Sequence, residues 1–348
     1  MKSNKMQNKK PTINKIEQLN IEVSGVCDLR CPMCPQSIGR EKDFLVMSDF
    51  DLIISAIDQA IPLGLEFVNF GGGGEPLLYK KLPEVISYLK ERNIKTLIYT
   101  NGTQLTPEKF EKLCIAGLTI CKVSCHGWDR ESFSQWMSKD YFDQIRDSLI
   151  DCKKILDINN YDTTLQTHHL INDIDKVDFQ LKMYRKNWVD YTGLETEIWL
   201  MHNWGGLVDK KSENLLSEKY NVPRWEMYKN REKRSCGRPL ANTVELRAGG
   251  VDGKKGAVVP CNIVMGHDSK AVMGHLSETP LMDIMNGEIF QNFRDIHLRR
   301  DFDELDVCKD CDQLIDAEEI LIWTNIEGRN YGESRVSNIE YLEAEKNY

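Results

Sequence analysis

Short β-rich runs alternate with amphipathic helical runs along the chain from about residue 16. In order, the runs read QLNIEVS, DFDLIISAIDQAI, EFVNFG, LPEVISYLKERN, KTLIYTNG, TPEKFEKLCIAG and LTICKVSCHG. Repeated βα units of this kind form parallel sheets, because each helix returns the chain to the edge where the next strand begins. The sequence therefore predicts an α/β fold built on a parallel sheet.

The same pattern continues through the first two hundred residues. Residues 106–108 (TPE) supply a cap, a first-turn proline and a first-turn acid for one helix. A helix near 140–156, a strand near 163–170 and a strand near 194–201 follow. Six strands are too few for a closed eight-stranded barrel, so we expect an open, partial (β/α)6 barrel.

The alternation stops at HNWGGLVDKKSENLL, and a region with a different pattern follows a polar, basic stretch. That region contains the hairpin-like VELRAGGVDGKKGAVVPC and a helical run around LMDIMNGEIFQNFRDI. We therefore expect a small C-terminal α+β domain. The predicted division is a flexible tail at 1–15, the barrel at 16–205, a linker at 206–235, the small domain at 236–325 and a tail at 326–348.

Three cysteines, Cys27, Cys31 and Cys34, lie within eight residues directly after the first expected strand. Structural zinc takes four closed ligands, and iron–sulfur clusters normally take four thiolates. Three thiolates on a four-iron cluster leave one iron open to an added ligand. The alternative is half of a zinc site that is completed by remote partners.

Composition limits the compartment and the partners. The chain has 11 cysteines, an odd number, and no export signal, which favours metal ligands and free thiols in a cytosolic protein. A net charge of −9 argues against nucleic acid as a partner, and no apolar run approaches the roughly 20 residues that a membrane helix needs.

The cysteine spacing, together with GGGGEP and YTNG at the ends of the next two strands, resembles the radical S-adenosylmethionine (SAM) superfamily over residues about 16–201. The resemblance implies a [4Fe–4S] cluster on Cys27, Cys31 and Cys34 whose open iron binds SAM. It also implies that an electron from the cluster cleaves SAM to a 5′-deoxyadenosyl radical, which abstracts a substrate hydrogen atom. Met33 departs slightly from the family, which often has an aromatic residue there.

The resemblance further implies which residues bind SAM. The SAM amino group is expected to bind to the motif Gly73, Gly74, Glu75 and Pro76. Asn101 and Ser124 end the next two strands and are further expected contacts, Ser124 to the SAM carboxylate. The alternatives are a plain tight loop, an Asn-Gly turn and a buried strand serine.

Alternation along the expected strand KVSCHG puts Ser124 and His126 on one face and Cys125 on the other. We therefore expect His126 to face the substrate and Cys125 to pack behind the sheet. Buried thiols usually behave as small apolar groups. A free thiol could instead donate a hydrogen atom to a substrate radical, and the candidates are Cys114, Cys121, Cys125 and Cys152.

The run WLMHNWGG ends the last expected barrel strand. His202, Asn203 and Trp204 could offer hydrogen bonds and a stacking face to a sugar or cyclitol. The alternative is a linker anchored by a buried tryptophan.

A second cysteine set, Cys236, Cys261, Cys308 and Cys311, lies in the C-terminal region. Its context resembles the SPASM or shorter twitch extension of radical SAM enzymes, which holds auxiliary clusters. The resemblance implies one auxiliary [4Fe–4S] cluster with complete protein ligation. A zinc site closed by the same four thiolates is the alternative.

The family fixes the first chemical step and leaves the product open. Peptide-modifying members commonly carry a leader-binding domain, which this sequence does not show, so we expect a small polar, carbohydrate- or cyclitol-like substrate. Dehydrogenation or epimerisation is the expected outcome, with a reducing donor protein such as flavodoxin or ferredoxin as partner. The alternatives are a peptide maturase or epimerase and a non-catalytic metal-binding scaffold.

Overall fold

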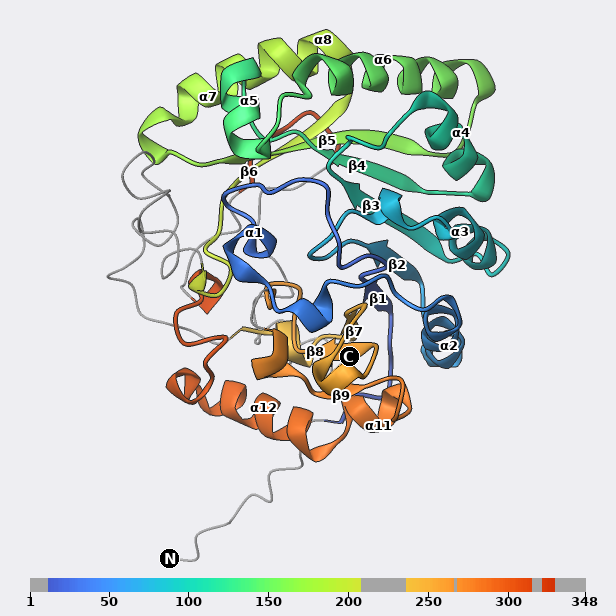
Figure 1. Cartoon of the computed structure of the whole chain (residues 1–348), viewed down its shortest axis with the longest axis vertical. Coiled ribbons are helices and arrows are strands. Elements are labelled where there is room, and N and C mark those ends of the chain that lie inside the picture. Colours follow the sequence, from blue (N-terminus) through green and yellow to red (C-terminus); the bar gives the residue numbers. More distant parts are fainter. Residues whose placement is uncertain (1–11, 208–235, 266–267, 315–320, 329–348) are drawn as a thin grey trace, which may run out of the picture.

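A computed structural model describes residues 12–207, 236–265, 268–314 and 321–328. These described residues form one ten-stranded sheet in the order β10-β6-β5-β4-β3-β2-β1-β7-β8-β9 (Figure 1). Except for its first two residues, the expected linker lies outside the described residues, as does most of each expected tail.

The first six strands are parallel neighbours in sequence order, which confirms the predicted partial barrel. They are β1 (Gln18–Ile21), β2 (Phe67–Phe70), β3 (Lys95–Thr100), β4 (Ile120–Ser124), β5 (Thr164–Ile171) and β6 (Glu195–Leu200). The other four are β7 (Thr243–Leu246), β8 (Ala257–Val259), β9 (Gly274–His275) and β10 (Leu321–Thr324).

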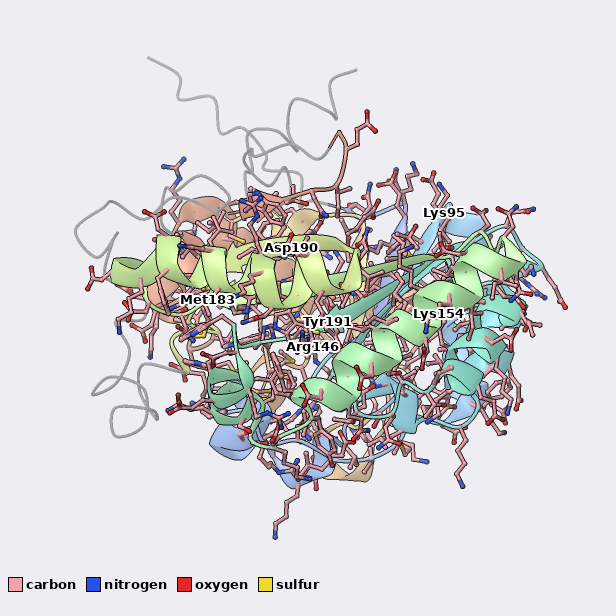
Figure 2. All side chains as sticks on the ribbon, turned by 90° about the horizontal axis from the view of Figure 1, so that it is seen from above. Lys95, Arg146, Lys154, Met183, Asp190 and Tyr191 are labelled. Carbon is pink, nitrogen blue, oxygen red and sulfur yellow. The ribbon has the colours of Figure 1, made fainter. Side chains whose placement is uncertain are left out.

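Helices cover the outer side of the curved sheet, and α1 lies on its concave side (Figure 1). The barrel helices are α1 (Pro35–Gly39), α2 (Phe50–Ala60), α3 (Leu82–Lys90), α4 (Pro107–Ala116), α5 (Arg130–Met137), α6 (Phe142–Asn159), α7 (Val177–Tyr184) and α8 (Asp190–Thr192). Thr106 caps α4 by accepting a hydrogen bond from the Lys109 amide. Between α6 and α8, the Arg146 guanidinium lies 3.5 Å from the Tyr191 ring centroid (Figure 2). None of the described helices is long and apolar enough to cross a membrane.

Alternation along the strands separates two kinds of surface. In β1, Leu19 and Ile21 point outward into the apolar core beneath the helices, whereas Asn20 faces the concave side. Further along that side, Lys122 of β4 and Glu197 of β6 form a buried ion pair with a 2.7 Å separation. The concave side of the sheet, called the inner face below, is therefore polar.

The C-terminal region continues the barrel sheet, and no local sequence pattern predicts this pairing. Strand β7 pairs in parallel with β1, and β8 pairs antiparallel with β7 as the expected hairpin. Strand β10 adds antiparallel to β6 at the opposite edge. The region expected as a small separate domain therefore borders the barrel on both sides.

Two local boundaries differ from the expectation. The expected flexible tail includes Ile13, which is buried and whose amide donates to Asn286 Oδ1 at 2.9 Å. The expected helix around 281–296 is two helices, α11 (Leu281–Met285) and α12 (Glu288–Arg299). Gly287 separates them in an extended conformation (φ −66°, ψ 159°).

Candidate cofactor and substrate site

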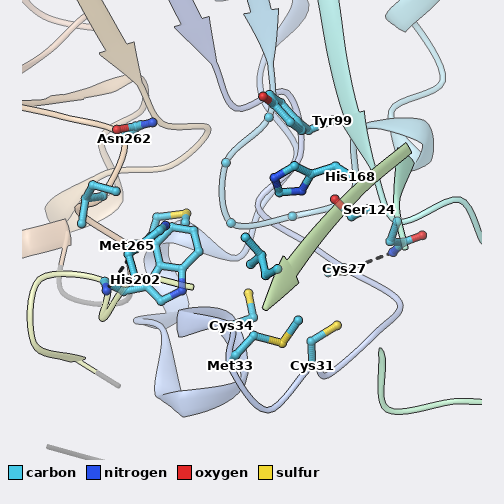
Figure 3. A pocket seen from close by; sticks show the side chains of 18 of the residues that line it. Cys27, Cys31, Met33, Cys34, Tyr99, Ser124, His168, His202, Asn262 and Met265 are labelled. Carbon is cyan, nitrogen blue, oxygen red and sulfur yellow. Dashed lines mark hydrogen bonds between the residues drawn. The ribbon is translucent and has the colours of Figure 1, made fainter. Parts of the chain in front are cut away.

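The three clustered cysteines lie on the loop between β1 and α1. The Cys34 amide donates to the Cys31 carbonyl at 2.9 Å, and Pro35 then starts α1. All three cysteines line one cavity of about 440 Å³ at the concave side of the barrel (Figure 3). Its size is in the range of small-molecule and cofactor sites.

Hydrogen-bond donors converge on Cys27. The Leu29 amide lies 3.5 Å from Cys27 Sγ, and Asn101 Nδ2 lies 3.6 Å from it. Burial raises the pKa of Cys27 to about 12 and also raises the pKa of Cys31 and Cys34. Iron binds thiolates, so binding of a cluster has to release the protons of these thiols.

Asp28 connects the cysteine loop to the end of β3 through hydrogen bonds. It accepts hydrogen bonds from Asn101 Nδ2 at 2.8 Å, Thr103 Oγ1 at 2.6 Å and Gln104 Nε2 at 3.0 Å. Burial works to raise the pKa of Asp28, but these three donors outweigh it and the pKa is lowered. Asn101 thus orients the cysteine loop in addition to lining the cavity.

The glycine-rich loop after β2 approaches the cysteine loop closely. The Gly73 amide donates to Glu22 Oε2 at 2.7 Å. A Cβ at Gly74 would lie 2.1 Å from the Ser24 carbonyl oxygen, and one at Gly73 would lie 2.1 Å from Arg40 Nη1. Only glycine allows this approach, so the predicted motif is placed against the cysteine loop.

Gly74→Ala should lower the free energy of unfolding by about 1 to 3 kcal/mol, because the methyl group overlaps main-chain atoms that cannot turn aside. Gly71→Ala is the matched control, since its Cβ would meet Tyr99 at 3.6 Å, an ordinary contact. Urea unfolding of the three proteins measures both effects. Equal midpoints for Gly74→Ala and Gly71→Ala would contradict the close approach.

Glu75 joins three segments. Its carboxylate accepts hydrogen bonds from the Leu77 amide, the Thr100 hydroxyl and the Asn101 amide, at 2.9, 2.7 and 2.7 Å. Burial raises the pKa of Glu75 to about 7, although these three hydrogen bonds lower it. Glu75 lines the cavity, whereas its neighbour Pro76 is buried and does not. The expectation that Pro76 touches SAM is therefore not supported, since this proline instead begins the turn that follows.

Ser124 and His126 both face the cavity, and Cys125 packs into the core behind the sheet, as alternation predicts. His168 of β5 lies beside them, 5.6 Å from His126 between ring centroids. Burial lowers the pKa of His126 to about 4 and also lowers the pKa of His168 well below its ordinary value, which favours neutral rings at pH 7. Trp188 Nε1 holds the loop after β4 by donating to the Gly127 carbonyl at 2.8 Å.

The three residues expected at the end of β6 separate into two groups. His202 and Trp204 line the cavity, with their ring centroids 4.1 Å apart. Asn203 does not: its Nδ2 donates to the Asp310 carbonyl at 2.9 Å and its Oδ1 accepts from the Asp312 amide at 3.1 Å. The assignment of Asn203 to the substrate is wrong, because this buried amide satisfies the main chain beside Cys311.

The candidate hydrogen-atom donors are also placed away from the cavity. All 11 cysteines are among the described residues, and of these only Cys27, Cys31 and Cys34 line it. The other barrel thiols are buried in the core, namely Cys114, Cys121, Cys125 and Cys152. They behave as small apolar groups.

A second, smaller cavity gathers the four cysteines of the C-terminal region, Cys236, Cys261, Cys308 and Cys311. Four thiols are the usual ligand set of a closed iron–sulfur cluster. His297 Nε2 lies 3.3 Å from Cys308 Sγ. Among the described residues, no three His, Cys, Asp or Glu side chains are close enough to bind a single metal ion.

Three side chains line both cavities: Arg238, Ile263 and Gln313. The Arg238 guanidinium donates to Asn262 Oδ1 at 3.0 Å and to Gln313 Oε1 at 3.5 Å. The two cavities are therefore separated by a single layer of side chains, called the shared wall below.

A buried network of charges joins the barrel to the C-terminal region. Arg40, just after α1, donates to Glu22 at 2.8 Å and to Asp268 at 3.2 Å. Asp268 also pairs with Arg247, which follows β7, at 3.4 Å. All four side chains are at most 1% exposed. The network fixes the cysteine loop and the glycine-rich loop relative to β7.

Sequence reasoning missed most of the inner-face residues that line the cavity. They are Asn20, Asn69, Tyr99, His168, Glu245 and Arg247. A signal was present for those in the barrel, since polar residues alternate with apolar ones in runs such as QLNI and KTLIYT. For Glu245 and Arg247 the signal lies in the pairing of β7 with β1, which no local pattern encodes.

Family models match two parts of the chain. The radical SAM superfamily model matches residues 21–177, and the SPASM iron–sulfur cluster-binding domain model matches residues 253–312. The chain therefore carries a radical SAM domain, followed by a C-terminal SPASM domain. The first domain implies a SAM-binding [4Fe–4S] cluster and the second an auxiliary iron–sulfur cluster, which fits the thiol sets of the two cavities.

The chain spans about two fifths or less of the length of the curated relatives described here. A probable GTP 3′,8-cyclase of Saccharolobus islandicus is 32% identical over 130 residues, which are 37% of this chain and 41% of that protein. The tungsten-containing aldehyde ferredoxin oxidoreductase cofactor-modifying protein of Pyrococcus furiosus is 30% identical over 110 residues, 31% of this chain and 30% of that protein.

Solved structures share the fold at low identity. The structure of BtrN in complex with AdoMet and 2-DOIA has a TM-score of 0.56 and 21% identity, and covers 89% of this chain and 98% of that one. The structure of Streptococcus suis SuiB bound to precursor peptide SuiA has a TM-score of 0.58 and 16% identity. That match covers 81% of this chain and 67% of the SuiB chain. These likenesses confirm the fold class.

Proposed function

We propose that this radical SAM protein dehydrogenates a small polar substrate after abstracting a hydrogen atom from it. One observation carries the proposal: a single cavity is lined by the three clustered thiols and by polar side chains of the inner face and of the SPASM region. In the proposal, Cys27, Cys31 and Cys34 hold the cluster that binds SAM. When bound and reduced by an external donor such as flavodoxin or ferredoxin, this pair supplies a 5′-deoxyadenosyl radical.

The lining favours a small polar substrate. Asn69 and Tyr99 present hydrogen-bonding groups on the neighbouring strands β2 and β3. Met33 and Trp204 add apolar surface that can pack against a ring and exclude water. We expect a carbohydrate- or cyclitol-like molecule to fit this mixture, and the BtrN structure holds 2-DOIA together with AdoMet on the same fold.

Two features favour dehydrogenation over epimerisation. Epimerisation needs a hydrogen-atom donor on the opposite face of the substrate, and no cysteine beyond the three clustered ones lines the cavity. Dehydrogenation instead needs an acceptor for one electron and one proton after the hydrogen atom has left. The shared wall places the cysteines of the SPASM region one side-chain layer away, where an oxidised auxiliary cluster would take that electron.

The competing functions differ in substrate or in activity. A peptide substrate is the second candidate, because SuiB binds a precursor peptide on the same fold. A metal-binding scaffold without activity is the third. The polar inner face, with its buried Lys122–Glu197 pair, favours a small solute over a peptide.

The test is turnover of the reconstituted, anaerobic protein with SAM, a reductant and a panel of cyclitols, sugars and short peptides in D2O. We expect one carbonyl product for each 5′-deoxyadenosine and no deuterium at the substrate carbon. Deuterium incorporation with inverted stereochemistry would establish epimerisation instead. Turnover of peptides alone, or no SAM cleavage at all, would reject the proposal.

A further inference from the structure

A buried carboxylate on the inner face has an oxygen without a partner. Glu245 is 5% exposed and lines the cavity. Its Oε1 accepts a hydrogen bond from Asn20 Nδ2 at 2.5 Å, while its Oε2 has no hydrogen-bond partner. Glu245 also forms no ion pair with any residue that the structure describes. A buried carboxylate in this condition is unfavourable unless it takes up a proton or a ligand supplies a donor.

The nearby cations are already committed to other acceptors. Arg247 donates to the Val264 carbonyl at 2.5 Å and pairs with Asp268 at 3.4 Å. Arg238 donates to Asn262 and Gln313 across the shared wall. Both guanidinium groups lower the pKa of Glu245, but neither donates to its Oε2, so a donor to that oxygen would have to come from a ligand.

A second unpartnered acceptor lies in the same row of the sheet. Strand register places Asn69 of β2 opposite Asn20 of β1, and Asn20 opposite Glu245 of β7. Asn69 also lines the cavity, and its Oδ1 has no hydrogen-bond donor. Asn20 Nδ2 is used by Glu245, and Asn20 Oδ1 accepts from Gln18 Nε2 at 2.8 Å. The row thus presents two vacant acceptors on either side of a satisfied amide.

We propose that Glu245 Oε2 and Asn69 Oδ1 form a subsite for the ammonium group of an amino-bearing polyol. The inference rests on the proposed function, because it names the chemical class of the small polar substrate. An ammonium group supplies several donors and a positive charge, whereas a hydroxyl supplies one donor and no charge. The ammonium therefore satisfies both acceptors and compensates the carboxylate.

The state of Glu245 agrees with this assignment. Burial raises its pKa to about 7, against the lowering effects of Arg247, Asn20 and Arg238. A bound cation favours the ionised carboxylate and so recovers the free energy that burial costs. The hydroxyls of the polyol would meet the other polar groups of the cavity, such as Tyr99 and His168.

Equilibrium binding to the reconstituted, SAM-loaded holoenzyme tests the inference with two matched probe pairs, scyllo-inosamine with scyllo-inositol and glucosamine with glucose. At least one amine should bind about tenfold or more tightly than its hydroxyl partner. Glu245→Gln should remove this preference, so that the amine and its hydroxyl partner bind with similar affinity. Glu195→Gln is the control, since this β6 carboxylate accepts from Gln166 at 2.7 Å and does not line the cavity.

The outcomes separate this inference from the proposed function. Equal binding within both pairs, binding of no probe, or an amine preference that survives Glu245→Gln would overturn the subsite. If neutral polyols are nevertheless dehydrogenated, the proposed function stands without it. If peptides alone are turned over, both fail. The cluster absorption spectrum and SAM affinity of Glu245→Gln should match those of the unmodified protein, which excludes a misfolded variant.

Discussion

Cys31→Ala should abolish reductive cleavage of SAM and leave the auxiliary cluster in place. Cys31 is one of three thiols that line the large cavity, so its loss leaves only two thiols there to bind a cluster. The second cavity has its own four thiols and does not include Cys31. Iron and sulfide should therefore fall from about eight to about four of each per chain, and 5′-deoxyadenosine should be absent.

Two further variants make this result specific. Cys308→Ala removes one of the four thiols of the second cavity and should destabilise the C-terminal region, because metal binding contributes to folding. Cys152→Ala removes a buried thiol that lines neither cavity, so its metal content should be unchanged. Circular dichroism and limited proteolysis measure the folded structure of these variants. Equal loss of folded structure in Cys31→Ala and Cys308→Ala would contradict two independent metal sites.

Zinc in place of iron at the second cavity would remove the proposed electron acceptor.

Arg40→Met should lower the free energy of unfolding by about 3 to 5 kcal/mol, the usual cost of removing one partner from a buried ion network. The change leaves the carboxylates of Glu22 and Asp268 facing each other without the cation that lies between them. It also frees the glycine-rich loop, because Glu22 holds the Gly73 amide. SAM affinity should therefore fall together with stability.

Arg130→Met provides the comparison, since Arg130 pairs with Asp140 and Asp143 at an exposed position. Exposed pairs contribute about 1 kcal/mol or less. Urea unfolding and SAM binding should therefore distinguish the two arginine variants clearly. Similar small effects in both would mean that the buried network does not fix the two loops.

Much of the fold could be predicted because its information is local. The βα alternation fixed six strands and their parallel order, since each strand pairs with its neighbour in sequence. Strand β7 was different: its hairpin with β8 was visible, but its pairing with β1 joins residues such as Asn20 and Glu245 that are 225 positions apart. Pairing over such a distance depends on tertiary packing.

The residues of the candidate site also divide into those that a local motif predicts and those that depend on distant segments. The clustered cysteines and the glycine-rich turn are compact motifs, and the structure brings both to one cavity. Asn203 was misassigned because position along a strand end does not reveal that a buried amide must satisfy the main chain of a distant segment. Glu245 was missed because its neighbours across the sheet come from the other end of the chain.

The parallel pairing of β7 with β1 also bears on the order of events during synthesis. Until residues 243–246 leave the ribosome, the edge of β1 that β7 later covers has no partner from that strand, and the row that contains Glu245 is incomplete. Closing so long a loop is slow, and an uncovered strand edge can pair with another chain. The nascent barrel should therefore depend on chaperones until β7 has been translated. Chains that stop before β7 should aggregate.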